Sequence, residues 1–200
     1  MRRIILASTS PRRKDILELI CSDFVIKKFY VDEEIEVNDK ISPNEIVKNI
    51  SEKKALNAVN FIEGEAIIIT ADTIVCTLDN EILGKPSTPE DALVMLKKLQ
   101  GTKHYVKTCI TVVDKNEDKT FSLQSDVTCT NIYMRALTEK EIKAYIKTGE
   151  PFDKAGSYGV QGKGVSFIEK VEGDYLNVVG MSLIKLSKML SSLGVNTLKL

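Results

Sequence analysis

Near the start of the chain, an apolar run gives way to Ser8, Ser10, Arg12 and Arg13. Ser10 suits a helix N-cap, and Pro11 suits the first helical position, whose N–H has no partner within the helix. A helix start offers unpaired N–H groups, and two hydroxyls and two guanidinium groups lie beside this one. Such groups can hold a phosphate chain. A surface turn with solvated arginines is the simpler interpretation when the segment is taken alone.

Two carboxylates could provide acid–base or metal chemistry. Asp72 follows the apolar run 66–71, which is typical of a buried central strand. We expect it at the end of that strand, where ligands gather in α/β folds, as a general base. An aspartate that only caps a turn is the common alternative. Glu33 follows a predicted strand over 24–30; solvated surface is the usual interpretation, but a divalent-ion site near Asp72 would need a second carboxylate.

Two lysines are candidate phosphate ligands. Lys54 lies within a predicted helix beside Lys53, and two adjacent lysines in a helix more often belong to a solvated face than to a binding site. Lys85 lies between Gly84 and Pro86, in a turn that would hold its side chain in place. A fixed ammonium group can neutralise a phosphate, although many such turns have no ligand.

The glycine-rich segment 156–164 does not match a P-loop, because Gly164 follows Gly162-Lys163 where a Ser or Thr is required. Ser157 also stands where the first glycine of that motif belongs. The amide of Gln161 offers a donor and an acceptor together, which suits contact with the edge of a flat ligand. A mobile surface loop is an equal alternative.

Composition excludes several classes of protein. Lys plus Arg and Asp plus Glu both number 28, so no overall basic field is present to hold nucleic acid. The apolar run after Met1-Arg2-Arg3 ends within four residues, too short for a signal peptide or membrane span. We therefore expect a cytoplasmic protein that binds neither nucleic acid nor membrane.

The histidine and cysteine content limits the chemistry further. His104 is the single histidine, which excludes a multi-histidine zinc site, and its place beside a predicted strand favours a structural role. The four cysteines form no Cys-x-x-Cys pair, so we expect reduced, buried thiols. Any metal should be a hard ion held by oxygen.

The elements that must position these residues indicate one domain over residues 1–200, of mixed α/β (α+β) class. Ser42-Pro43-Asn44-Glu45 and Thr138-Glu139-Lys140-Glu141 each have the pattern of a capping box that opens a helix. The predicted helices cover 12–20, 43–59, 89–100 and 139–148, with a last amphipathic helix that carries Leu183, Leu186, Leu190 and Leu193. The predicted strands cover 24–30, 66–71, 105–113, 120–135 and 165–171.

In combination and order, these motifs resemble the Maf family of nucleoside triphosphate pyrophosphatases, once described as septum-formation inhibitors. The resemblance runs from residue 4 to about residue 186. Thr108-Cys109 and Met181-Ser182-Leu183 depart from the family pattern. The segments that carry the resemblance are Leu6-Ala7-Ser8-x-Ser10-Pro11-Arg12-Arg13, Val31-Asp32-Glu33, Lys54-Ala55, Thr70-Ala71-Asp72-Thr73, Gly84-Lys85-Pro86, His104-x-Val106, Ala155-Gly156-Ser157-Tyr158-Gly159-x-Gln161-Gly162 and Glu172-Gly173-Asp174-Tyr175-x-Asn177-Val178-Val179-Gly180.

The resemblance implies a fold like that of inosine triphosphatases, with a central mixed sheet flanked by helices. It also implies cleavage of a nucleoside triphosphate between the α and β phosphorus atoms, with Mg²⁺ or Mn²⁺. Asp72 would accept the proton from water, Glu33 would help to hold the metal or a second water, and both are candidate metal ligands. The residues expected to hold the triphosphate are Ser8, Ser10, Arg12, Arg13, Lys54 and Lys85.

In such enzymes, the preferred base depends on the residues at three positions, which correspond here to Arg12, Thr73 and Gln161. This trio resembles the dTTP/UTP subgroup, and a glutamine amide can pair with the edge of uracil or thymine. Dimers are common in the family. The alternatives are an enzyme acting on modified nucleotides and a non-catalytic, nucleotide-binding regulator of septum formation.

Overall fold

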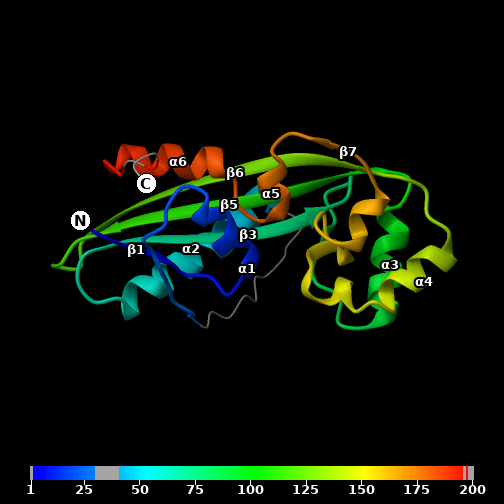
Figure 1. The fold of residues 1–200 in the computed structure, drawn as a ribbon, viewed down its shortest axis with the longest axis horizontal. Helices are drawn as coiled ribbons and strands as arrows, with labels where there is room; N and C mark the ends of the chain where they lie inside the picture. The colour runs from blue at the N-terminus through cyan, green and yellow to red at the C-terminus, as the bar shows by residue number, and fades with distance from the viewer. Residues whose placement is uncertain (1, 30–40, 196, 198–200) are drawn as a thin grey trace. The chain divides into compact units, whose positions relative to one another are not determined.

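The computed structural model describes residues 2–29, 41–195 and 197, and Figure 1 shows their arrangement. The helices are α1 (Pro11–Glu18), α2 (Pro43–Phe61), α3 (Pro89–Leu99), α4 (Glu139–Ile146), α5 (Tyr175–Val179) and α6 (Leu183–Ser192). The strands are β1 (Arg3–Leu6), β2 (Val25–Ile26), β3 (Ala66–Cys76), β4 (Ile82–Leu83), β5 (Lys103–Lys115), β6 (Phe121–Met134) and β7 (Ile168–Glu172). Short 3₁₀ helices are η1 (Glu150–Asp153), η2 (Ala155–Ser157) and η3 (Lys163–Phe167).

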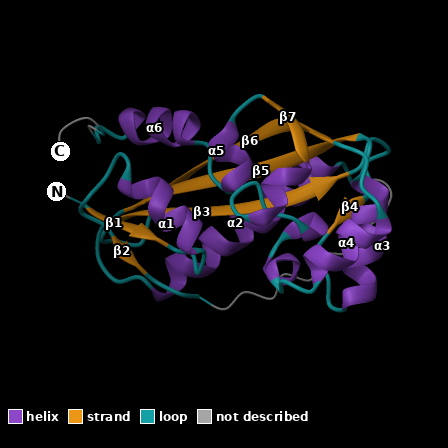
Figure 2. Cartoon of the chain, turned by 45° about the vertical axis from the view of Figure 1, so that its right-hand side comes forward, coloured by secondary structure: helices purple, strands orange, loops and turns teal. Residues whose placement is uncertain are grey.

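The strands form one mixed sheet, which Figure 2 shows in orange among the helices. Its order is β2-β1-β3-β5-β6-β7, and β4 pairs with β3. The strand β1 runs parallel to both β2 and β3, whereas β4 and β7 are antiparallel to their partners. This mixed sheet with flanking helices confirms the predicted fold class.

Contacts divide the chain into two compact units, and β3, β5 and β6 each contribute residues to both. The first unit is 1–72, 108–128 and 180–200, and the second unit is 73–107 and 129–179.

In the first unit, α2 packs on one face of the sheet. Its buried side chains Ala55, Ala58 and Val59 recur at the spacing of a single helical face. They pack with Ile5 and Ile68, which the register of β1 and β3 places opposite each other. The helix begins at Pro43 with the predicted capping box, in which Ser42 and Glu45 each bond the other's backbone N–H.

In the second unit, α3 and α4 pack together over a core that includes Leu96, Leu99, Ile142 and Tyr145. Both helices begin with capping boxes, and the box at Thr138 is the predicted one. The end of α3 is also as predicted, because Gly101 follows it with φ of +65°, a conformation that glycine adopts without strain.

Three sequence predictions about strands were wrong. Asp72 lies within β3 and not at its end, because the β-branched residues that follow it continue the strand and β4 pairs with the strand's last two residues. Of the segment predicted as a strand over 24–30, the described part, 24–29, forms only the exposed β2, which pairs with the last two residues of β1. The predicted strand over 165–171 begins as η3 and becomes β7 at Ile168.

The cysteines are unpaired, as predicted, but only two of them are buried. Burial raises the pKa of Cys76 and of Cys109 to about 11, which keeps both thiols protonated at neutral pH. Cys21 is half-buried and Cys129 is exposed. Within the described residues, no helix combines the length and the apolar character needed to cross a membrane.

Candidate active site

The loop between β1 and α1 is organised around the Ser8 hydroxyl. The Ser10 backbone N–H donates to Ser8 Oγ at 3.2 Å, and Arg13 Nη1 donates to the same oxygen at 3.4 Å. Arg13 Nε also donates to the Gly180 carbonyl at 3.0 Å, so its guanidinium group is fixed from two sides. Ser10 is the N-cap of α1 and Pro11 its first residue, as predicted, although the Ser10 side chain makes no capping hydrogen bond. Arg12 is half-buried beside them.

Lys54 and Asp72 form an ion pair. Lys54 Nζ lies 2.6 Å from Asp72 Oδ1, and the side chains are 17% and 13% exposed. The neighbouring Lys53 is exposed, so the two lysines of the pair differ in environment. The expectation of a solvated face is correct for Lys53 and wrong for Lys54, whose ammonium group reaches the carboxylate on β3.

Buried hydroxyl groups fix α2 against the sheet next to this ion pair. Thr70 Oγ1 donates to the Ser51 carbonyl at 2.9 Å, and Ser51 Oγ lies 2.8 Å from Thr111 Oγ1. Ser51 is one helical turn before Lys54, and Thr70 is two strand residues before Asp72. Each pair therefore shares a face of its element, and the hydroxyl contacts set the register in which lysine meets aspartate. Ser51 was not among the predicted site residues, although its spacing from Lys54, together with that of Thr70 from Asp72, is a signal in the sequence.

The β1–β3 register brings the serine–arginine loop to the same part of the sheet. Leu6 pairs with Ile69, and the Ala7 N–H continues the ladder by donating to the Ile69 carbonyl at 2.8 Å. The loop from Ser8 therefore begins beside the stretch of β3 that carries Asp72. The first unit thus contains both the loop that carries Ser8 and Arg13 and the Lys54–Asp72 ion pair.

Thr73, Lys85 and Gln161 belong to the second unit. Thr73 is half-buried on β3, and strand alternation turns its side chain to the face opposite that of Asp72. Lys85 and Gln161 are exposed, in the turn after β4 and in the glycine-rich loop respectively.

One hydrogen bond joins the turn of Lys85 to the start of the glycine-rich loop. The Gly156 N–H donates to the Gly84 carbonyl at 3.0 Å. Gly156 has φ of +69°, and a Cβ there would lie 2.9 Å from Val75 Cγ1, so only glycine fits. The segment 156–160 is buried, and the interpretation as a mobile surface loop is therefore wrong for this part of it.

His104 has the structural role that the sequence predicted. It is fully buried, and its Nε2 lies 2.7 Å from the Tyr158 hydroxyl. Burial lowers the pKa of His104 to about 4, so the imidazole is neutral at pH 7.

This burial predicts a loss of stability in acid. Below about pH 6.5 the unfolded chain binds a proton at His104 that the folded protein binds only near pH 4, so the free energy of unfolding falls through that interval. The fall attributable to His104 is about 3 kcal/mol. Urea unfolding at pH 7 and pH 4 checks this value. His104→Gln, which keeps a polar contact for Tyr158 but does not titrate, should lose that much less stability; equal losses in both proteins contradict the prediction.

The described residues offer few metal ligands. Within the ranges 2–29 and 41–195, no three His, Cys, Asp or Glu side chains gather into a group that could hold a metal. Glu33, the predicted second ligand, lies outside the described residues. Asp72 alone fits a Mg²⁺ ion that takes its other ligands from water and phosphate, as Mg²⁺ commonly does.

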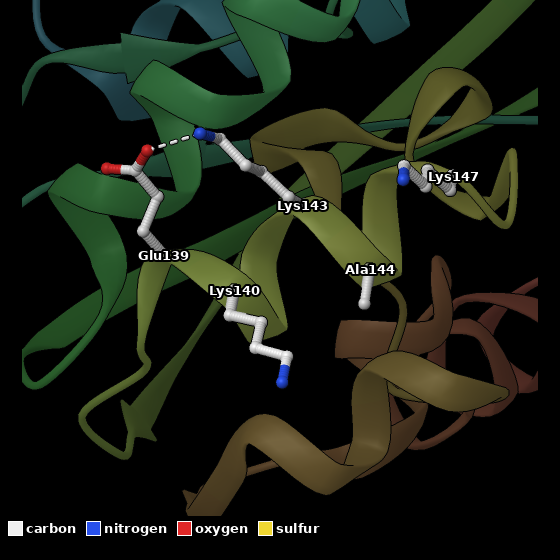
Figure 3. Close-up of a pocket in the computed structure, with 5 residues that line it drawn as sticks. All are labelled: Glu139, Lys140, Lys143, Ala144 and Lys147. Carbon is white, nitrogen blue, oxygen red and sulfur yellow. Dashed lines mark ion pairs between the residues drawn. The ribbon is translucent and has the colours of Figure 1, made fainter.

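An open pocket of about 530 Å³ lies on α4, in the second unit. Figure 3 shows its lysines projecting from one helix, with Lys143 paired to Glu139. None of the predicted site residues lines this pocket. Its lining consists of surface side chains of α4 and of the residue that directly follows it: Glu139, Lys140, Lys143, Ala144 and Lys147. Its lining therefore supplies none of the groups assigned to phosphate binding or proton transfer.

Comparisons with known proteins bear on the family and the fold of the chain. A family model described as Maf-like protein matches residues 3–193. A dTTP/UTP pyrophosphatase of Bacillus pumilus is 44% identical over 195 residues, 98% of both chains. One of Alkaliphilus metalliredigens is 46% identical over 190 residues, 95% of both chains. The solved Ham1 protein of Staphylococcus aureus covers 96% of this chain and 99% of its own at 13% identity, with a TM-score of 0.50, which shows a likeness of fold alone. The match to the family model and these identities show that the chain belongs to the Maf family.

Proposed function

We propose that this protein is a nucleoside triphosphate pyrophosphatase that hydrolyses dTTP and UTP to the nucleoside monophosphate and pyrophosphate. The names of its relatives support this class of hydrolase. The observation that carries the proposal is the largely buried Lys54–Asp72 ion pair, in the same unit as the loop of Ser8 and Arg13. That combination supplies a fixed carboxylate next to groups suited to phosphate oxygens.

In the proposed mechanism, Asp72 takes a proton from a water molecule while the water oxygen attacks the α-phosphorus. The bond from the α-phosphorus to the oxygen bridging it to the β-phosphorus breaks, and pyrophosphate leaves with that electron pair. Lys54 holds Asp72 through Oδ1, which makes Oδ2 the oxygen that receives the proton. The groups that hold the phosphates are Ser8, Ser10, Arg12, Arg13, Lys54 and Lys85, so catalysis is mostly positioning and charge stabilisation.

We also propose that the enzyme requires Mg²⁺ or Mn²⁺. When bound, the ion would neutralise charge on the phosphate oxygens. Asp72 and Glu33 are its candidate ligands. That the enzyme acts in the cytoplasm and forms a homodimer stays a prediction from the family resemblance.

The experiment that tests the function is pyrophosphate release from dTTP and UTP with Mg²⁺ present. A pyrophosphatase releases it with turnover, whereas a nucleotide-binding regulator of septum formation binds the nucleotides and releases none. A panel of modified pyrimidine nucleotides in the same assay separates pool sanitation from use of the common nucleotides.

Base selection is assigned to Gln161, together with Arg12 and Thr73. We expect Gln161→Glu to lower the kcat/KM for UTP by about tenfold or more, because a carboxylate cannot donate to a uracil carbonyl. The measurement is the ratio of kcat/KM for UTP to that for GTP in the wild type and the variant. An unchanged ratio contradicts this role of Gln161.

A further inference from the structure

The Glu150 carboxylate, at the start of η1, accepts hydrogen bonds from two directions. Its Oε1 accepts from the Tyr145 hydroxyl at 2.9 Å and from the Gly164 N–H at 3.1 Å. Its Oε2 accepts from the Lys163 N–H at 2.9 Å. In addition, Lys154 Nζ donates to the Glu150 carbonyl at 2.9 Å. One carboxylate therefore links the end of α4 to the far side of the glycine-rich loop.

These contacts fall on both sides of Gln161. The Gly159 N–H, two residues before it, donates to the Tyr145 hydroxyl at 3.3 Å. The Lys163 N–H, two residues after it, donates to Glu150. Gln161 itself is exposed between these anchors. A single pair, Tyr145 and Glu150, thus bonds the loop on both sides of Gln161. We call this pair the Tyr–Glu clamp.

The loop packs on the clamp too closely for side chains at two positions. A Cβ on Gly162 would lie 2.9 Å from Glu150 Oε1, and φ there is +107°. A Cβ on Gly164 would lie 2.8 Å from the Tyr145 hydroxyl oxygen and 2.6 Å from the Gly159 carbonyl oxygen. The glycines of this loop therefore permit close contact with the clamp, in addition to allowing an unusual backbone.

The ionisation of the two clamp residues matches their hydrogen bonds. Burial raises the pKa of Glu150, but the N–H donors of Lys163 and Gly164 outweigh it and hold the pKa below its usual value. Burial, together with the neighbouring Glu150, raises the pKa of the Tyr145 hydroxyl above its usual value. At neutral pH the carboxylate is thus charged and accepts, and the phenol keeps its proton and donates.

We propose that Glu150 is a positioning residue for base selection, because the Tyr–Glu clamp holds the Gly159–Gly164 loop in the conformation that presents Gln161 to the nucleobase. This inference rests on the proposed function, in which Gln161 contacts the base. It assigns to Glu150 no part in the attack on phosphorus. Its loss should therefore raise KM and reduce discrimination between bases, with kcat largely kept.

The test is Glu150→Gln. A glutamine has one acceptor oxygen for three donors and turns an NH₂ group toward an N–H, so at least one anchor is lost. We expect KM for UTP to rise about tenfold, the size of a lost hydrogen bond to a charged group, with kcat within about threefold of wild type. The ratio of kcat/KM for UTP to that for GTP should fall by a similar factor. Added to Gln161→Ala, Glu150→Gln should lower that ratio no further, because the group it positions is absent.

The matched control is Glu172→Gln in the same unit. Glu172 Oε2 also accepts from a tyrosine hydroxyl, that of Tyr133 at 3.1 Å, and from Asn131 at 2.9 Å, but no hydrogen bond joins it to the loop. It should leave KM and the base ratio unchanged. If Glu150→Gln does not fold, Tyr145→Phe replaces it, since this change removes the hydroxyl and keeps the ring that packs edge-on against Phe167.

The outcomes separate this inference from the function on which it depends. Wild-type KM and base ratio in Glu150→Gln, or a fall in kcat alone, overturn the inference and leave the enzyme activity intact. Equal effects in Glu172→Gln overturn it as well. If the wild type releases no pyrophosphate, the proposed function fails, and the affinities for UTP and GTP decide the inference: equal affinity ratios in wild type and Glu150→Gln overturn it.

Discussion

Asp72→Asn is expected to lower kcat for pyrophosphate release from dTTP by about 10²- to 10⁴-fold, the usual contribution of a general base. KM should change little, because the amide is close in size to the carboxylate and the phosphate ligands are untouched. The ion pair with Lys54 at 2.6 Å becomes a hydrogen bond to a neutral oxygen, so the side chain stays in place. Steady-state kinetics with saturating Mg²⁺ separate the two parameters.

The control for this variant is Asp126→Asn. Asp126 also pairs with a lysine, Lys185 at 2.7 Å, and both side chains are 39% exposed. The same chemical change away from the site should leave kcat within about twofold, since exposed pairs contribute little. Near-normal turnover in Asp72→Asn removes Asp72 from the mechanism, and an equal loss in Asp126→Asn shows an effect that is not specific to the site.

The sequence predicted Asp72 as a candidate base because it follows a buried strand, and only part of that reasoning is correct. The apolar run before it does form a buried strand, but the prediction took the end of that run as the end of the strand. Strand propensity is weaker than pairing, and β4 supplies a partner for the residues beyond Asp72. A partner that lies ahead in the chain cannot be found from the residues of β3 alone.

Capping signals were far more reliable, because they are local. The boxes at Ser42 and Thr138 need only residues three positions apart, and both form as predicted. The role of Lys54 could not be predicted in this way, since its distinction from Lys53 depends on which side of α2 meets the sheet. That choice depends on residues far apart in sequence, because Ala55 and Ala58 pack on the sheet and Ser51 contacts Thr70 and Thr111.

Glu150, to which we assign a role in base selection, also could not be predicted from the sequence. A glutamate after a helix-ending glycine has the pattern of a surface residue, and no spacing ties it to Gln161. Its importance follows from the loop folding back, so that the backbone N–H groups of Lys163 and Gly164 reach it. When a side chain accepts hydrogen bonds from backbone N–H groups, the donor positions need no particular residue type. The exceptions here are the glycines, which the close approach of the loop to the clamp requires.

Lys54→Met should lower both activity and stability. Methionine keeps much of the length of lysine but leaves the Asp72 carboxylate, 13% exposed, without its ammonium partner. Breaking such a pair from one side is expected to lower the free energy of unfolding by about 3 kcal/mol. Loss of the charge that orients Asp72 should lower kcat/KM for dTTP by about 10²-fold. Lys53→Met, one position away and exposed, is the control and should change neither quantity.

The double variant Lys54→Met/Asp72→Asn separates the two effects. Removing both charges leaves no unpaired ion in the interior, so its free energy of unfolding should exceed that of Lys54→Met by about 2 kcal/mol. Its activity should stay at or below that of Asp72→Asn, because the base is absent. Urea unfolding and pyrophosphate release are measured on the wild type, the two single variants and the double variant, which gives the stability and the activity of each. A double variant no more stable than Lys54→Met contradicts the burial of an unpaired carboxylate, and full activity in Lys54→Met contradicts its role in orienting Asp72.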